Sequence, residues 1–167
     1  EPDEHGVPFY FRINGVPVGK ELGKHYMSDR LAQNPDGSCM IVVATDAPLG
    51  SRNLERMAKR AMLGLARTGG ISSNGSGDYV IAFSVNEKVR VAHQSDRSML
   101  SRNVLRNDAM SPLFLAVIEA TEEAILNSLF VASTETGIGG RTILELPEGR
   151  VLQILETYAK TKSGGQP

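Results

Sequence analysis

The sequence has one cysteine, three histidines and little net charge. Cys39 has no second cysteine in the sequence to pair with, so nothing marks an oxidising compartment. The net charge is −1, and Lys and Arg alternate with acidic residues, which argues against a nucleic-acid surface. His5, His25 and His93 lie far apart and lack zinc-ligand spacing, so no metal site is predicted.

Long apolar runs are also missing. The most apolar segment, near residues 112–132, carries three glutamates, which excludes a membrane span there. The chain opens with acidic residues where a signal peptide would carry basic ones, so we expect a cytoplasmic protein without membrane contacts. A length of 167 residues is enough for one domain with its own core.

Apolar periodicity predicts a mixed α/β domain in which helices cover the faces of a sheet. The run at residues 40–45 is continuously apolar and β-branched, which predicts a strand buried on both faces. Other strands are expected at 7–13, 79–85 and 89–93. Helices are expected to begin after the N-cap Ser51 and at Ser111-Pro112, and a last helix is expected over 147–160. Loops are expected at 19–37, 67–77 and 137–140. These strands are too few for two complete sheets, so we expect a further segment to supply the rest.

Gly37-Ser38 stands directly before the apolar strand. If the Gly37–Ser38 bond is cut, Ser38 gains a free α-amine beside its own hydroxyl. Such an amine has a pKa of about 7.7–8.0, which suits a general base at neutral pH. Nucleophile and base then belong to one residue, and Gly37 tolerates the strained backbone that self-cleavage needs. The alternative is an ordinary turn through Asp36 into the strand.

The Gly-rich stretch at 69–77 offers a second candidate feature. It lacks the Lys-Ser/Thr of a phosphate loop, and a strand follows where a helix should begin. Ser76 and Asp78 stand two residues apart at the mouth of that strand, so their side chains face the same side. This spacing predicts a carboxylate that orders a hydroxyl, with Gly75 and Gly77 donating backbone N–H groups to an anion. A turn cap, in which Ser76 bonds local backbone, is the alternative.

Several runs together resemble one known family. They are Phe11-Arg-Ile-Asn-Gly-Val-Pro-Val-Gly19, Ser38-Cys-Met-Ile-Val-Val-Ala-Thr-Asp-Ala-Pro-Leu49, Leu63-Gly-Leu-Ala-Arg-Thr-Gly69, Asn74-Gly-Ser-Gly-Asp-Tyr-Val-Ile-Ala-Phe-Ser84 and Ala120-Thr-Glu-Glu-Ala-Ile-Leu-Asn-Ser128. In order and spacing they resemble the self-processing aminopeptidases that include L-aminopeptidase/D-amidase/D-esterases and β-peptidyl aminopeptidases.

The resemblance implies a precursor cut between Gly37 and Ser38. Residues 1–37 would be the C-terminal end of the α chain, and residues 38–167 the catalytic β chain with Ser38 as nucleophile. Ser76 matches the family's second active-site serine, and Asp78 matches an acid that is Glu in some members. The implied fold is an αββα sandwich similar to N-terminal-nucleophile hydrolases but with different connectivity, of which this chain supplies only part.

The resemblance also implies the activity and the partners. We expect release of N-terminal amino acids from short peptides, amides or esters, without metal, nucleotide or flavin, by a homo-oligomer of αβ units. Ornithine acetyltransferases, which are similar in fold and use Thr where this chain has Ser38, are one alternative. A non-catalytic domain that retains the fold is the other.

Overall fold

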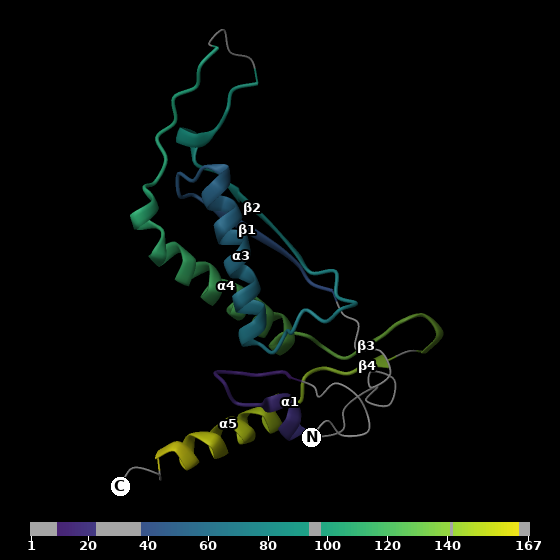
Figure 1. Ribbon diagram of the computed structural model, residues 1–167. Helices are drawn as coiled ribbons and strands as arrows, with labels where there is room; N and C mark the ends of the chain where they lie inside the picture. Colours follow the sequence, from purple (N-terminus) through teal and green to yellow (C-terminus); the bar gives the residue numbers. More distant parts are fainter. Residues whose placement is uncertain (1–9, 23–37, 94–97, 141, 164–167) are drawn as a thin grey trace.

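The computed structural model describes residues 10–22, 38–93, 98–140 and 142–163 (Figure 1). The structure does not describe residues 1–9 and 23–37, which include Gly37. Parts of the strand expected at 7–13 and of the loop expected at 19–37 therefore lie outside the described residues. The helices are α1 (Val18–Leu22), α3 (Ser51–Arg67), α4 (Ser111–Phe130) and α5 (Glu148–Ser163); the strands are β1 (Met40–Thr45), β2 (Tyr79–Ser84), β3 (Glu135–Thr136) and β4 (Thr142–Ile143).

A β1–α3–β2 unit forms the centre of the described chain. The two strands pair in parallel, from Met40 opposite Tyr79 to Thr45 opposite Ser84. Parallel strands need a crossover of a dozen or more residues, which α3 supplies. In Figure 1, α3 lies between the strand pair and α4. Both helices are therefore on the same face of the sheet, with α3 directly against the strands and α4 packed on α3.

The strand pair is covered on one face only within the described chain. Ile41, Val43 and Val80 pack against a core that contains Leu49, Met57, Ala61, Met110 and Val117. On the opposite face, Met40 and Val42 are 58% and 54% exposed, and Ile81 is 51% exposed. The strand prediction for 40–45 is therefore confirmed, whereas its predicted burial on both faces is wrong for the described chain.

Gly64 allows a close crossing of α3 and α4. A Cβ atom at this position would lie 2.6 Å from the Ile118 carbonyl oxygen and 2.6 Å from the Thr121 Cβ atom. Thr121 is buried at this crossing, and its hydroxyl donates to the Val117 carbonyl oxygen at 2.7 Å. The absence of a side chain at residue 64 therefore lets α3 pack closely against α4.

A second core joins the N-terminal segment to α5. Phe11, Val16 and Val18 pack against Val151 and Ile154. The strand expected at 7–13 is wrong for residues 10–13. The chain makes only a single bridge there, between Ile13 and Val16, which lie on either side of a turn. Residues 14 and 15 have φ angles of 48° and 78°, the left-handed conformation that an Asn-Gly turn typically adopts. Residues 19–22 were expected in a loop and instead belong to α1.

Two further predictions are corrected. Residues 89–93 form no strand: Glu87–Val89 is a 3-10 turn, because the Asn86 side chain accepts the Lys88 N–H and donates to the Asp46 carbonyl oxygen. Gly50, not Ser51, is the N-cap of α3, with Ser51 the first helical residue. The helices from Ser111-Pro112 and near 147–160 are confirmed, and residues 137–140 connect β3 to β4. No helix in the described ranges is long and apolar enough to cross a membrane.

Candidate active site

The parallel register places Ser38 opposite Gly77, two residues before the strand ladder begins. The Gly77 N–H donates to the Ser38 Oγ atom at 3.0 Å. A Cβ atom on residue 77 would lie 3.3 Å from that oxygen, so glycine gives the hydroxyl its room. Ser38 is exposed. Its oxygen is thus accessible and accepts a backbone donor, which favours negative charge on the oxygen.

Asp78 links the loop before β2 to the start of β1. Its Oδ1 atom accepts the Cys39 N–H at 2.7 Å, and its carboxylate also accepts the Ser76 hydroxyl. These bonds hold the pKa of Asp78 below its usual 3.8, with the Ser76 bond the largest cause, while partial burial acts in the opposite direction. Asp78 therefore stays ionised at neutral pH and acts only as an acceptor.

Four of the predicted site residues come together in this structure: Ser38, Ser76, Gly77 and Asp78. The Ser76 hydroxyl bonds Asp78, and its backbone N–H donates to the Ser73 carbonyl oxygen at 2.9 Å within the loop. The catalytic role of Ser76 stays a prediction. Gly77 was expected to donate to an anion and here donates to Ser38. Gly75 is exposed, and its backbone role stays a prediction.

Cys39 faces away from the Ser38 hydroxyl. It is half-buried, whereas Ser38 is exposed, as the alternation of side chains along an extended chain requires. Its backbone still contributes to the site, because the Cys39 N–H bonds Asp78 and its carbonyl oxygen accepts the Tyr79 N–H at 3.2 Å.

Sequence reasoning missed Ser72. It lies in the Gly-rich loop, has a φ of 48°, and makes the smallest contribution to the lowered pKa of Asp78. Nothing in a run of Gly, Ser and Asn distinguishes the serines that affect the carboxylate from the others.

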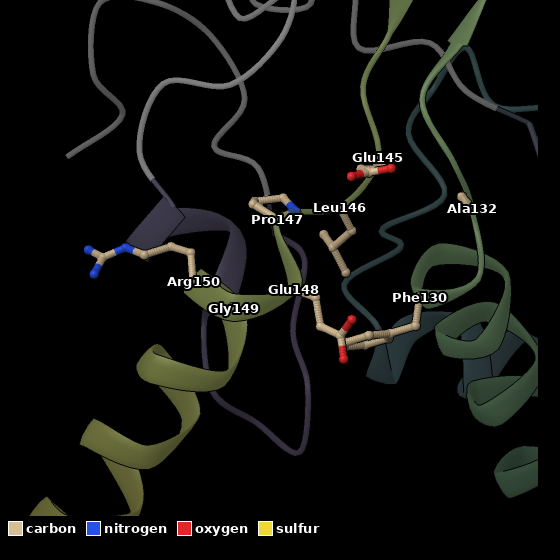
Figure 2. A pocket seen from close by; sticks show the side chains of 8 residues that line it. All are labelled: Phe130, Ala132, Glu145, Leu146, Pro147, Glu148, Gly149 and Arg150. Atoms are coloured by element: carbon tan, nitrogen blue, oxygen red, sulfur yellow. The ribbon is translucent and has the colours of Figure 1, made fainter.

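A cavity of about 460 Å³ lies elsewhere, between the end of α4 and the start of α5 (Figure 2). Its lining residues are Phe130, Ala132, Glu145, Leu146, Pro147, Glu148, Gly149 and Arg150. None of them belongs to the Ser38 cluster. We place the candidate site at Ser38 because the polar groups converge there, whereas the cavity is open and its side chains form no comparable network.

Comparison with known proteins shows the family of the chain. The model of peptidase family S58 matches residues 5–143, which is most of the chain. The chain belongs to peptidase family S58. The resemblance to self-processing aminopeptidases stated above is therefore confirmed at the level of the family.

Relatives within family S58 are similar in sequence and in fold. A β-peptidyl aminopeptidase of Sphingosinicella microcystinivorans is 40% identical over 93% of this chain. The structure of a Pyrococcus horikoshii OT3 protein superposes with a TM-score of 0.76 at 42% identity, covering 92% of this chain. The L-aminopeptidase D-Ala-esterase/amidase of Ochrobactrum anthropi superposes with a TM-score of 0.78 at 29% identity, covering 93%.

The fold comparison also supports the predicted class. The Ochrobactrum structure is described as a new variant of the N-terminal-nucleophile hydrolase fold, and this chain shares that fold over the matched length. The chain spans only 41% of the curated Sphingosinicella relative and 40% and 41% of the two solved chains. The described residues accordingly show two strand pairs, β1–β2 and β3–β4, with helices on one face of the first.

Proposed function

We propose that this chain carries the nucleophile of a self-cleaving serine aminopeptidase or amidase. One observation carries the proposal: the Ser38 Oγ atom accepts the Gly77 N–H at 3.0 Å, beside the Ser76–Asp78 hydrogen bond, at the start of a parallel strand pair. Membership of a peptidase family and relatives named as aminopeptidases support it.

In the proposed reaction, Ser38 Oγ attacks the carbonyl carbon of the substrate and the Ser38 α-amine takes the hydroxyl proton. The amine then passes that proton to the leaving amine as the scissile C–N bond breaks, leaving an acyl ester on Oγ. Water attacks the ester, releases the amino acid and restores the hydroxyl. Ser76 and Asp78 orient the amine and hydroxyl, and backbone N–H groups stabilise the oxyanion.

The same hydroxyl would perform the maturation step. Attack of Ser38 Oγ on the Gly37 carbonyl carbon moves the Gly37 acyl group from the Ser38 nitrogen to Oγ, and the hydroxyl proton passes to the departing nitrogen. Water then hydrolyses this ester, which releases the Gly37 carboxylate and leaves Ser38 with its hydroxyl and the α-amine on which turnover depends. Residues 1–37 would then end the α chain, and residues 38–167 would form the β chain. The Gly77 N–H supports this step, because it stabilises charge on Oγ before any amine exists.

The proposed partners follow from the uncovered face of the sheet. Met40, Val42 and Ile81 expose large apolar side chains there. We expect the remaining α-chain part of the precursor to cover this face, and αβ units to assemble into a homo-oligomer, which analytical ultracentrifugation would measure. We propose a cytoplasmic location because Cys39 has no second cysteine in the sequence to pair with, and cell fractionation tests this location.

The substrate would be a short peptide, amide or ester with a free N-terminal amine. The relatives' names cover β-peptidyl, L-aminoacyl and D-alanyl substrates. Matched anilides of β-alanine, L-alanine and D-alanine would rank these classes by kcat/KM. Acetyl transfer from N-acetylornithine to glutamate, in the absence of anilide hydrolysis, would favour the acetyltransferase alternative instead.

The deciding experiment is the intact mass and N-terminal sequence of the protein expressed from its complete gene. We expect a chain that begins Ser-Cys-Met-Ile, and Ser38→Ala is expected to stay uncut. Ser73→Ala, a hydroxyl deletion in the neighbouring loop, serves as the matched control and should still be cut. A wild-type chain that stays uncut and hydrolyses none of the anilides would contradict the proposal.

A further inference from the structure

The Ser38 side chain lies on the sheet face opposite to α3. Ser38 and Met40 are exposed, whereas Ile41 between Met40 and the next exposed residue is half-buried and packs into the core. Successive side chains of an extended chain point to opposite faces, so Met40 is the first side chain after Ser38 on the face of the hydroxyl. Two residues of extended chain span about 6.6 Å, so Met40 begins within the reach of a small group bound at Ser38.

The neighbouring strand adds Tyr79 at the same place. Tyr79 pairs with Met40 in the first rung of the β1–β2 ladder, and it follows Gly77, whose N–H bonds Ser38 Oγ, by two residues. The Tyr79 hydroxyl donates to the Met40 Sδ atom at 2.9 Å. Both side chains are exposed. The phenol ring and the thioether thus form a joined apolar surface, the Met40–Tyr79 rung, directly beside the nucleophile.

The chemistry of this rung differs from that of the next one along the sheet. Val42 pairs with Ile81 there, and both are purely aliphatic, which suits a permanent cover. Tyrosine instead suits places where one end of the side chain is apolar and the other is wet, and the thioether sulfur is only a weak acceptor for its hydroxyl. A substrate must also reach Ser38 Oγ. The α-chain part expected over this face therefore has to stop short of the Met40–Tyr79 rung.

The proposed reaction decides which part of the substrate meets the rung. The leaving amine takes its proton from the α-amine of Ser38, so it must lie toward that nitrogen. The nitrogen is on the N-terminal side of Ser38, whereas the Met40–Tyr79 rung is on the C-terminal side. The leaving group is therefore directed away from the rung, and the acyl group is directed toward it.

We propose that Met40 and Tyr79 are specificity-determining residues that contact the side chain of the amino acid whose carbonyl is attacked. An apolar side chain packs on the ring and the thioether, and the flexible methionine adapts to its shape. This inference rests on the function proposed above and deepens it, because it assigns the part of this chain that selects the substrate.

The test compares acyl groups with and without a side chain on mature enzyme made from the full-length precursor. Leucine anilides of both hands are compared with glycine anilide, and β-homoleucine anilide with β-alanine anilide. Rates are expressed per active Ser38 from the acylation burst, so incomplete maturation does not enter the comparison. Met40→Ala and Tyr79→Ala should each lower the ratio of kcat/KM for the larger over the smaller acyl group about tenfold.

Two further variants isolate the cause. Tyr79→Phe removes the bond to sulfur but keeps the ring, and it should keep the ratio within about twofold of wild type. Ile81→Ala, one rung farther along the same face, is the matched control and should leave the ratio unchanged. If an alanine variant does not fold or mature, Met40→Leu and Tyr79→Leu keep apolar bulk in a different shape. They should change the order of leucine, valine and phenylalanine anilides.

The outcomes distinguish this inference from the proposed function. An active wild type whose ratio is unmoved by Met40→Ala and Tyr79→Ala, or whose order of anilides is unmoved by the leucine variants, would overturn the role of the rung and leave the aminopeptidase proposal standing. A loss that follows the leaving group, measured by replacing the anilide with a methyl ester, would overturn it too. A wild type that neither cleaves itself nor hydrolyses any anilide removes the proposed function and this inference together.

Discussion

Replacing Gly64 by alanine tests the helix crossing that supports the site. The new Cβ atom would lie 2.6 Å from both the Ile118 carbonyl oxygen and the Thr121 Cβ atom, and 3.1 Å from the Thr121 Cγ2 atom. Carbon atoms in good contact lie about 3.5–4.0 Å apart, so the overlap is about 1 Å. Ile118 contributes backbone here, which no rotamer change can move. α3 and α4 must therefore separate.

The expected cost follows from two opposing terms. Overpacking of a well-packed core costs about 1–3 kcal/mol, and a backbone clash belongs at the upper end of that range. Alanine gains about 0.8–1.0 kcal/mol over glycine inside a helix. We therefore expect a net loss of about 1–2 kcal/mol in the free energy of unfolding, and a lower Tm.

The assay is denaturant and thermal unfolding of the full-length Ser38→Ala precursor, in which every molecule is expected to have the same covalent state. Gly149→Ala in α5 is the matched control, because a Cβ atom there would meet nothing within 4 Å. The control should be neutral or gain up to about 1 kcal/mol. A Gly64→Ala protein as stable as the Gly149→Ala protein would refute the close crossing of α3 and α4.

Three further predictions concern the site and the exposed sheet face. Gly77→Ala places a Cβ atom 3.3 Å from Ser38 Oγ and should slow self-cleavage at least about tenfold in an intact-mass time course; wild-type speed would contradict the close contact. Because the folded-state pKa of Asp78 is lowered, its contribution to stability is present above its usual 3.8 and is lost as pH falls through the lowered value. The Tm difference between wild type and Asp78→Asn should therefore shrink in acid. A difference that stays constant with pH would contradict the lowered pKa of Asp78. Ile81→Lys should lower the Tm of the full-length protein by several degrees, whereas an unchanged Tm would show that this face is left in water.

Much of the central unit could be predicted from the sequence. Apolar β-branched runs define strands near 40–45 and 79–85, and helical spacing with Pro112 in the first turn predicts α4. The proximity of Ser76 and Asp78 also follows from local spacing, because residues two apart in an extended chain share a side. Such predictions succeed where the determining contacts lie within a few residues.

The predictions that failed depend on contacts distant in sequence. Residues 89–93 alternate like a strand, but Asn86 bonds the backbone of Asp46, 40 residues away, and starts a 3-10 turn instead. Apolar residues such as Val42 predict burial, yet the pattern cannot say which segment provides the cover. The pairing of Ser38 with Gly77 likewise depends on the register of two strands, which no single run of residues specifies.

That register also explains why these residue types stand at the site. Where the backbone ladder of β1 and β2 has not yet begun, the Gly77 N–H bonds Ser38 Oγ and the Cys39 N–H bonds Asp78 Oδ1. Two side-chain oxygens thus accept N–H groups that a longer ladder would give to carbonyl oxygens. The strands are held together up to Ser38, by bonds that involve Ser38 and the residues after it. If Ser38 is cut from the residue before it, as proposed above, its pairing with Gly77 survives the loss of the Gly37–Ser38 bond.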